Sequence, residues 1–261
     1  MAVVNEGNRF QQYSDFIGYC MLVFGAFGII GNSLSIIVLI KKEKICFNYL
    51  LVALNCFDTF HIVFAILDVI RNNHEEAYPD TLLSIFPYFH YPLYRWVHLM
   101  NGYPMLPFFR LSLCVSIYLI VAITCERYVA VTKPRTRLTS SQMTRAMMYV
   151  LPCVLIATLL NIGKFFEAET VSYCVDFTSC GCGYHEITYV RPTQLRLSRN
   201  YIIFYSTWTW VTMTSLGPFF ILSVLNFIIW RKLGQAKKTM AEMNPNVHHP
   251  KVSMTLLLLF Y

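Results

Sequence analysis

The stretch from Cys46 to Leu67, CFNYLLVALNCFDTFHIVFAIL, decides how this chain folds. It is almost entirely apolar, and a helix of about 20 such residues is long enough to cross a lipid bilayer. Asp58 lies within this stretch, where leaving a carboxylate in hydrocarbon costs at least about 2.5 kcal/mol. Because a simple membrane anchor has no use for such a group, Asp58 indicates a signalling or transport bundle.

Composition places the whole chain in a membrane. Of its 261 residues, 56% are hydrophobic and only 13% are charged, whereas soluble domains carry about 25% charged residues. Apolar runs long enough to span a bilayer, some with flanking residues, predict helices at about 16–40, 46–70, 106–131, 145–165 and 200–231. We therefore predict a single all-α membrane domain over 1–261. It has five spanning helices, the start of a sixth at 251–261, and outer loops at 71–105 and 166–199.

Basic residues set the orientation of these helices. With five spans, 13 of the 21 lysines and arginines fall on the same face as three acidic residues. Since cytoplasmic loops are enriched in lysine and arginine, this face is expected to be cytoplasmic. The N-terminus is then extracellular, as in a multi-pass protein of the plasma membrane. A nucleic-acid partner is not expected, because no basic stripe with interleaved aromatic residues occurs.

The segment from Thr81 to Arg110 is unusual for a spanning helix. It contains four prolines and many aromatic residues, a mixture that interrupts helices and favours the membrane interface. Two interpretations stay open, an outer loop or re-entrant cap and a kinked outer end of the second or third helix.

Three of the nine cysteines, Cys174, Cys180 and Cys182, cluster in the second outer loop. That loop is expected to face an oxidising compartment, which allows a disulfide there. A structural zinc ion would need four ligands, and only His185 lies nearby. The sequence therefore argues against zinc.

Motifs in successive spans are similar to those of the rhodopsin-like G-protein-coupled receptors. In chain order they are Gly31-Asn32, Leu54-x-x-x-Asp58, Glu126-Arg127-Tyr128 and Pro218. A lone Glu-Arg-Tyr is weak evidence, whereas the four motifs together at matching depths are specific. The resemblance implies a seven-transmembrane receptor bundle, here cut short at its C-terminal end.

A narrower similarity covers roughly Gly28 to Leu233 and rests on several short motifs. They are Phe86-Pro87-Tyr88, Ser116-Ile117-Tyr118, Lys164-Phe165-Phe166-Glu167, Arg191-Pro192-Thr193 and Asn200-Tyr201. These motifs resemble those of invertebrate FMRFamide-type neuropeptide receptors. The resemblance implies three partners, an amidated neuropeptide ligand, a heterotrimeric G protein and the lipid bilayer.

The resemblance also assigns an ion site inside the spans. In this family the carboxylate at Asp58 coordinates a sodium ion together with a serine of the third span, here Ser116, close to Asn32 of the first. The alternative is a carboxylate satisfied by Asn32 and water alone. Hard cations take oxygen ligands of this kind, which favours the sodium ion. No other cofactor is expected.

Glu126, Arg127 and Tyr128 are implied to form the activation switch on the G-protein side. Arg127 would pair with Glu126 at rest and be released when an agonist shifts the bundle. An arginine that merely snorkels to the interface is the alternative. Pro218 removes a backbone hydrogen bond and gives the fifth helix a place to flex.

The peptide site follows from the chemistry of the implied ligand. FMRFamide-like peptides end in an arginine followed by an amidated phenylalanine, so the site should offer carboxylates and aromatic rings. The candidates are Phe108, Phe109, Glu167, Glu169, Asp176 and Glu186. An acidic outer surface can also merely mirror the positive-inside rule, so this set is a hypothesis.

The chain departs from the family pattern at three places. Gly102 stands where most members have the cysteine that ties the third helix to the second outer loop, and Asn226 replaces a tyrosine of the fifth helix. The remainder of helix six and all of helix seven are missing. A truncated receptor that does not signal, or that blocks a full-length partner, is therefore an alternative. A transporter or channel is remote because no internal repeat occurs, and an enzyme is not expected.

Overall fold

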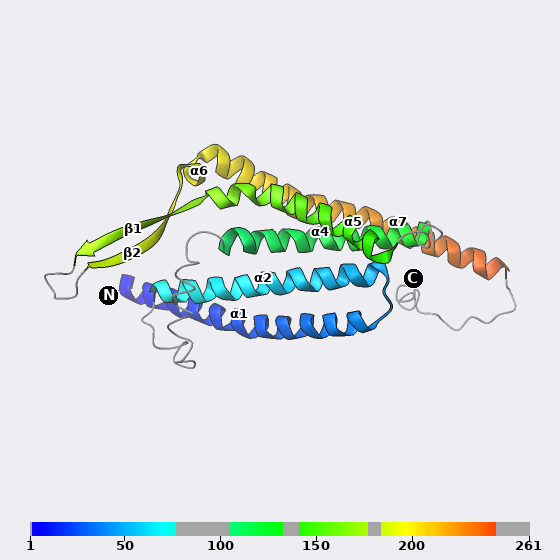
Figure 1. Cartoon of the computed structure of the whole chain (residues 1–261), viewed down its shortest axis with the longest axis horizontal. Helices are drawn as coiled ribbons and strands as arrows, with labels where there is room; N and C mark the ends of the chain where they lie inside the picture. Colours follow the sequence, from blue (N-terminus) through cyan, green and yellow to red (C-terminus); the bar gives the residue numbers. More distant parts are fainter. Residues whose placement is uncertain (1, 77–104, 133–140, 177–183, 244–261) are drawn as a thin grey trace.

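The computed structural model describes residues 2–76, 105–132, 141–176 and 184–243. Within these ranges, five helices are long and apolar enough to cross a membrane: Ile17–Lys41, Cys46–Leu67, Pro107–Thr132, Gln142–Phe166 and Tyr201–Gln235. They run side by side along the long axis of the molecule (Figure 1). The predicted all-α membrane architecture with five spans is thereby confirmed.

The five spans are built from helices of different kinds. The first three lie in α1 (Ala2–Lys41), α2 (Cys46–Glu76) and α4 (Met105–Thr132). The fourth consists of α5 (Gln142–Asn161) followed by the 3-10 helix η3 (Ile162–Phe166). The fifth joins the π-helices η5 (Tyr201–Thr209) and η6 (Thr212–Leu216) to α7 (Gly217–Met243). Helix α1 begins well before the expected residue 16, while 251–261 and most of the proline-rich segment lie outside the described residues.

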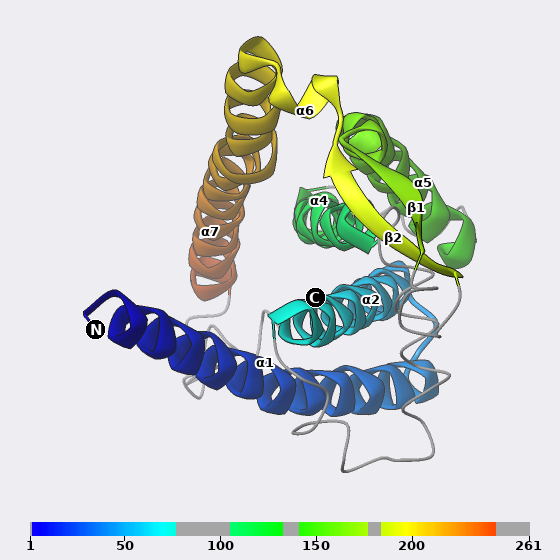
Figure 2. The same ribbon diagram turned by 90° about the vertical axis from the view of Figure 1, so that its left-hand side faces the viewer.

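Helix α4 is the centre of the bundle. It packs against α2, α5 and α7, while α1 packs against α2. Figure 2 shows α4 between α7 on one side and α5 on the other, with α2 below it and α1 beyond α2. The core therefore consists mainly of α4 side chains and their neighbours, among them Leu50, Cys114, Val115, Leu119 and Ala157.

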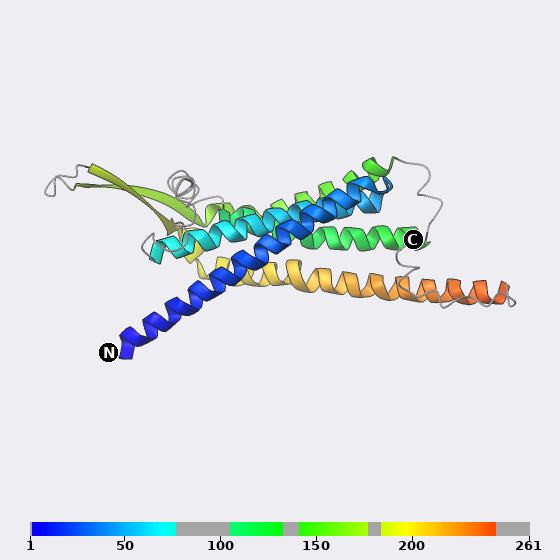
Figure 3. The ribbon, with the colours of Figure 1, turned by 90° about the horizontal axis from the view of Figure 1, so that it is seen from below.

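Small residues let α1 approach α2 closely. A Cβ atom at Gly25 would lie 2.9 Å from Cδ1 of Ile66, and one at Gly28 would lie 2.8 Å from Cδ1 of Ile62. Spanning helices often use small residues in this way, because van der Waals packing drives their association in lipid. Towards its N-terminus α1 diverges from α2 (Figure 3).

The outward surface of the spans is apolar. Phe24 and Phe27 of α1, Leu159 of α5 and Phe204 and Phe219 of the fifth span are each more than half exposed. In water such a surface would associate, whereas in a bilayer it contacts lipid tails. The distribution of side chains thus agrees with a membrane-spanning bundle.

The segment predicted as the second outer loop, 166–199, contains an antiparallel β-hairpin that its sequence pattern did not predict. Strands β1 (Ala168–Asp176) and β2 (Tyr184–Pro192) pair from Ala168 opposite Pro192 to Asp176 opposite Tyr184, and the short helix α6 (Gln194–Leu197) follows. β-Branched and aromatic residues along both strands favour extended structure. The hairpin extends past the ends of the spanning helices (Figure 1).

A proline in the fifth span removes one backbone donor of the helix. The Gly217 N–H donates to the carbonyl of Thr212, five residues back. With the same five-residue spacing, the N–H of residue 218 would donate to the Met213 carbonyl, but Pro218 has no N–H. Instead, the Tyr118 hydroxyl of α4 donates to the Met213 oxygen at 2.9 Å. The proline thus creates a polar contact between the third and fifth spans.

Replacing Tyr118 with phenylalanine should therefore destabilise the bundle. The change leaves the Met213 carbonyl without its donor, and an unsatisfied polar group of this kind costs about 1–3 kcal/mol. Thermal unfolding of the chain in detergent micelles should give a lower Tm for Tyr118→Phe. Tyr19→Phe, on the exposed side of α1, serves as control. Equal Tm values for the two variants would contradict this role of Tyr118.

Candidate functional site

At the end of the bundle predicted to be cytoplasmic, here called the inner end, Glu126 contacts the fourth span. Its carboxylate is fully buried and accepts hydrogen bonds from Nη2 of Arg145, 3.0 Å from each oxygen. Tyr149, one turn further along α5, also interacts with this carboxylate. Gln142 joins the same region to α2, because its Oε1 accepts the Cys46 backbone N–H at 3.2 Å. The inner ends of α2, α4 and α5 are thus joined by polar contacts.

Arg127 projects towards α2. Its guanidinium lies over the ring of Phe47, 4.6 Å from the ring centroid. Neighbouring residues on a helix do not face each other, which explains why Glu126 and Arg127 reach different helices. Tyr128 is half-buried beside them. The predicted pairing of Arg127 with Glu126 stays a prediction.

The three residues expected to hold sodium lie on three adjoining helices. Asn32 is on α1, Asp58 on α2 and Ser116 on α4, and α2 packs against both other helices. Ser116 is buried, and its Oγ has no hydrogen-bond partner. A buried hydroxyl oxygen of this kind fits a site completed by an ion or a water molecule. Sodium binding itself stays a prediction.

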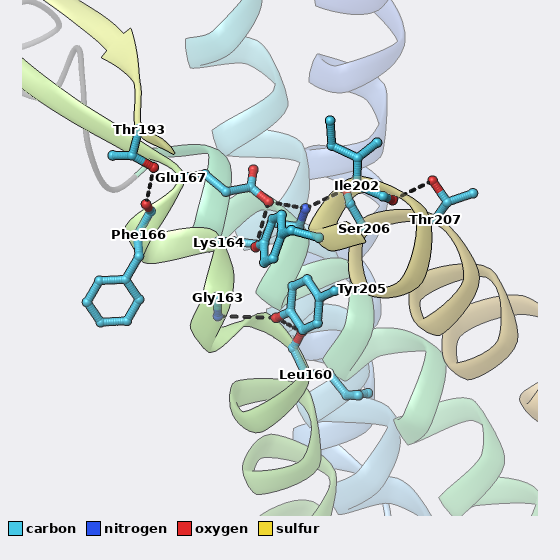
Figure 4. Close-up of polar contacts among 11 residues, drawn as sticks. Leu160, Gly163, Lys164, Phe166, Glu167, Thr193, Ile202, Tyr205, Ser206 and Thr207 are labelled. Carbon is cyan, nitrogen blue, oxygen red and sulfur yellow. Dashed lines mark hydrogen bonds and ion pairs between the residues drawn. The ribbon is translucent and has the colours of Figure 1, made fainter. Parts of the chain in front are cut away.

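At the opposite end, predicted to be extracellular and here called the outer end, a polar cluster joins the fourth and fifth spans. Lys164 of η3 is buried and forms an ion pair with Glu167, and its ammonium group donates to Oγ of Ser206 at 2.9 Å. The Tyr201 hydroxyl donates to the same Glu167 carboxylate at 2.9 Å. Figure 4 shows Lys164 and Glu167 pointing towards the fifth span. Both buried charges are therefore partnered, as burial requires.

Tyr205 forms hydrogen bonds with the backbone at the C-terminal end of α5, beside this cluster. Its hydroxyl donates to the Leu160 carbonyl at 2.7 Å and accepts the Gly163 N–H at 3.1 Å (Figure 4). A Cβ atom at Gly163 would lie 2.9 Å from the Tyr205 ring and from the Tyr201 hydroxyl. Only glycine at position 163 therefore allows the two tyrosines to approach so closely.

The same cluster fixes the base of the hairpin. The Thr193 N–H donates to the Glu167 carbonyl at 3.0 Å, and the Thr193 hydroxyl donates to the Phe166 carbonyl at 2.6 Å. Glu167 therefore connects the hairpin through its backbone and the fifth span through its side chain. Its carboxylate, predicted as a peptide contact, is already engaged with Lys164 and Tyr201.

The two predicted aromatic residues belong to contacts among the outer ends of the helices. Phe108 stacks on Phe64 of α2 with ring centroids 5.8 Å apart and meets Phe165 edge to face at 5.5 Å. Phe109 stacks on His61 at 4.3 Å. Phe108 keeps 39% of its surface exposed, so part of it remains accessible to a ligand.

The remaining acidic candidates lie on the hairpin. Glu169 pairs with Arg191, its cross-strand partner, at 2.5 Å, and both side chains are about half exposed. Asp176 stands opposite Tyr184, and Glu186 opposite Cys174, in the strand register. Their side chains lie outside the described part of the chain, as do the side chains of Cys174, Cys180 and Cys182. Peptide contact and the disulfide stay predictions.

Several residues of these clusters escaped the sequence analysis. Arg145 and Lys164 were treated only as members of a charge count or a motif, although each neutralises a buried carboxylate. Arg110 was named only as the end of the proline-rich segment, yet it lies inside α4, and its guanidinium lies 4.9 Å from the ring centroid of Trp210. A charge within a spanning segment is the signal that could have identified it.

Together these features define a class of protein. Five membrane-length helices, with buried charges that are paired inside the bundle, are the features of a multi-spanning membrane protein.

Comparison with known proteins also indicates a multi-spanning membrane protein and identifies its family. Residues 103–261 match the family model described as 7 transmembrane receptor (rhodopsin family). An FMRFamide receptor from Drosophila melanogaster is 30% identical over 237 residues, 89% of this chain. The chain belongs to the rhodopsin family of seven-transmembrane receptors and resembles FMRFamide receptors. It spans about 40% of the length of that Drosophila relative.

Proposed function

We propose that the chain acts in a receptor for an amidated, arginine-containing peptide and relays binding to a heterotrimeric G protein. The observation that carries this proposal is its 30% identity to an FMRFamide receptor over most of the chain. The protein would lie in the plasma membrane with its N-terminus and hairpin outside. The excess of basic residues at the opposite end supports that orientation.

The inner end supplies the G-protein contact in this proposal. Arg127 lies next to a fully buried carboxylate that Arg145 neutralises. A stacking contact with Phe47 holds the Arg127 guanidinium over an aromatic ring, and such contacts are worth about 0.5–2 kcal/mol. An interaction of this strength is small enough to be exchanged for a contact with a partner protein.

The outer end supplies the peptide contact. The exposed part of Phe108 is open to an aromatic ligand group. Asp176 and Glu186 of the hairpin would offer negative charge to the ligand's cations, and Glu169 would do so by exchanging its half-exposed pair with Arg191. Glu167 would act indirectly, because its carboxylate is already bonded to Lys164 and Tyr201. It holds the hairpin base in place for the other residues.

We expect FMRFamide to bind saturably to membranes that contain the chain. A labelled peptide should be displaced by unlabelled FMRFamide, and much less by the peptide in which norleucine replaces arginine. Arg127→Ala should leave binding intact but abolish peptide-stimulated nucleotide exchange on added G protein. Absence of saturable binding would contradict the receptor proposal, and unchanged exchange by Arg127→Ala would contradict the role of Arg127.

We also propose that Asp58, Ser116 and Asn32 hold a sodium ion. The buried, unpartnered Oγ of Ser116 supports this site. An ion that binds only the folded state stabilises it, by about 1.4 kcal/mol at ten times its Kd. The Asp58 carboxylate would supply the charge, and the two neutral side chains would supply further oxygen ligands.

Replacing the potassium salt of the buffer by sodium at constant ionic strength should therefore raise the Tm of the chain in micelles. Asp58→Asn and Ser116→Ala should remove this difference. Ser112→Ala should keep it, because the buried Ser112 hydroxyl donates to the Phe109 carbonyl instead. The same Tm in both salts for the unaltered chain would rule out the sodium site.

A further inference from the structure

Arg110 is a half-buried cation near the outer end of the central helix. Its guanidinium lies over Trp210, 4.9 Å from the ring centroid, and that ring packs against the core of the bundle. Among the described residues, Arg110 forms no ion pair with a carboxylate. The aromatic ring fixes the position of the guanidinium without neutralising it.

The charges around Arg110 do not balance. Lys164 and Glu167 form a pair and cancel each other, and Arg110 lies within Coulombic range of Lys164 and of Tyr201. Arg196 also acts on Lys164. Among the described residues around it, Arg110 therefore adds a positive charge that no carboxylate pairs with. This charge repels a ligand cation and attracts a hydrogen-bond acceptor.

Trp210 also borders a narrow crevice between the fourth and fifth spans, which is too small to hold even a water molecule, so that a ligand's ring would pack on its rim and not inside it. Lys164, Tyr205 and Met213 line this crevice together with Trp210. An acceptor group on Arg110 would thus lie beside aromatic and apolar surface. Such surroundings suit an aromatic residue that carries an oxygen acceptor, since the ring and the oxygen can be bound together.

We propose that Arg110, supported by Trp210, binds the oxygen at the C-terminal end of the peptide, whether that end is an amide or a carboxylate. This inference rests on the proposed peptide-receptor function and deepens it. In a peptide such as FMRFamide, both cations, the N-terminal amine and the arginine, are disfavoured near Arg110. The C-terminal phenylalanine amide combines an aromatic ring with a carbonyl oxygen and no charge. The peptide then enters with this end towards the bundle and its cations towards the hairpin.

A double-mutant cycle between residue 110 and the peptide terminus tests the contact directly. FMRFamide and its free acid would each compete with labelled FMRFamide on membranes that contain the unaltered chain or Arg110→Gln. An arginine–carboxylate contact is stronger than an arginine–amide contact. Arg110→Gln should therefore weaken the free acid more than the amide and change the ratio of their affinities by roughly tenfold.

Two further variants distinguish a direct contact between Arg110 and the peptide from an effect of charge alone. Arg110→Lys keeps the charge and should keep the affinity ratio close to that of the unaltered chain, although both peptides bind less tightly. Arg199→Gln removes an exposed charge from the same end of the bundle and should leave the ratio unchanged.

The outcomes are distinguishable. If the unaltered chain binds the peptides but the ratio is the same in Arg110→Gln, the proposed contact is wrong and the receptor function stands. If Arg110→Gln does not reach the membrane, Arg110→Lys decides: it should weaken the binding of both peptides relative to Arg199→Gln, and equal affinities in these two variants overturn the contact. If the unaltered chain binds neither peptide, the receptor function fails and this inference fails with it.

Discussion

Charges that lie inside a bilayer must find their partners within the protein, and this constraint organises the whole bundle. Glu126 meets it through Arg145 at the inner end, and Glu167 meets it through Lys164 at the outer end. Removing one member of a buried ion pair lowers the stability of the fold by much more than the pair contributes to it, because an uncompensated charge remains buried. The fourth span is therefore joined to the third at its inner end and to the fifth at its outer end.

This arrangement links the two faces of the membrane through one rigid element. Helix α4 carries Arg110 near its outer end and Arg127 near its inner end, about 25 Å apart at 1.5 Å per residue. Between them, Tyr118 contacts the Met213 carbonyl of the fifth span. This contact lies in a π-helical stretch of the fifth span, and π-helical turns occur frequently at functional positions. A ligand at the outer end would act on the same helix that presents Arg127.

Hydrophobic run length was enough to predict the five spans, because lipid imposes a minimum length on any spanning helix. Asp58 and Glu126-Arg127-Tyr128 could be selected because polar groups at such depths are rare. The partner of Glu126 could not be predicted, since Arg145 lies 19 residues away and adjoins it only after α4 and α5 pack. The hairpin was missed because a two-stranded element gives a weak local signal. Arg110 was missed because it lies at the edge of an apolar run, where an interfacial cation is ordinary.

Glycosylation mapping tests the central claim, that the chain crosses the membrane with the Lys164–Glu167 end outside and the Glu126–Arg145 end in the cytoplasm. The sequence has no Asn-x-Ser/Thr site, so each engineered site reports alone. Asp176→Asn creates a site in the hairpin, and His248→Thr creates one beyond the fifth span. The account predicts a glycan on the Asp176→Asn variant only. A glycan on the His248→Thr variant, with none on the Asp176→Asn variant, would contradict it.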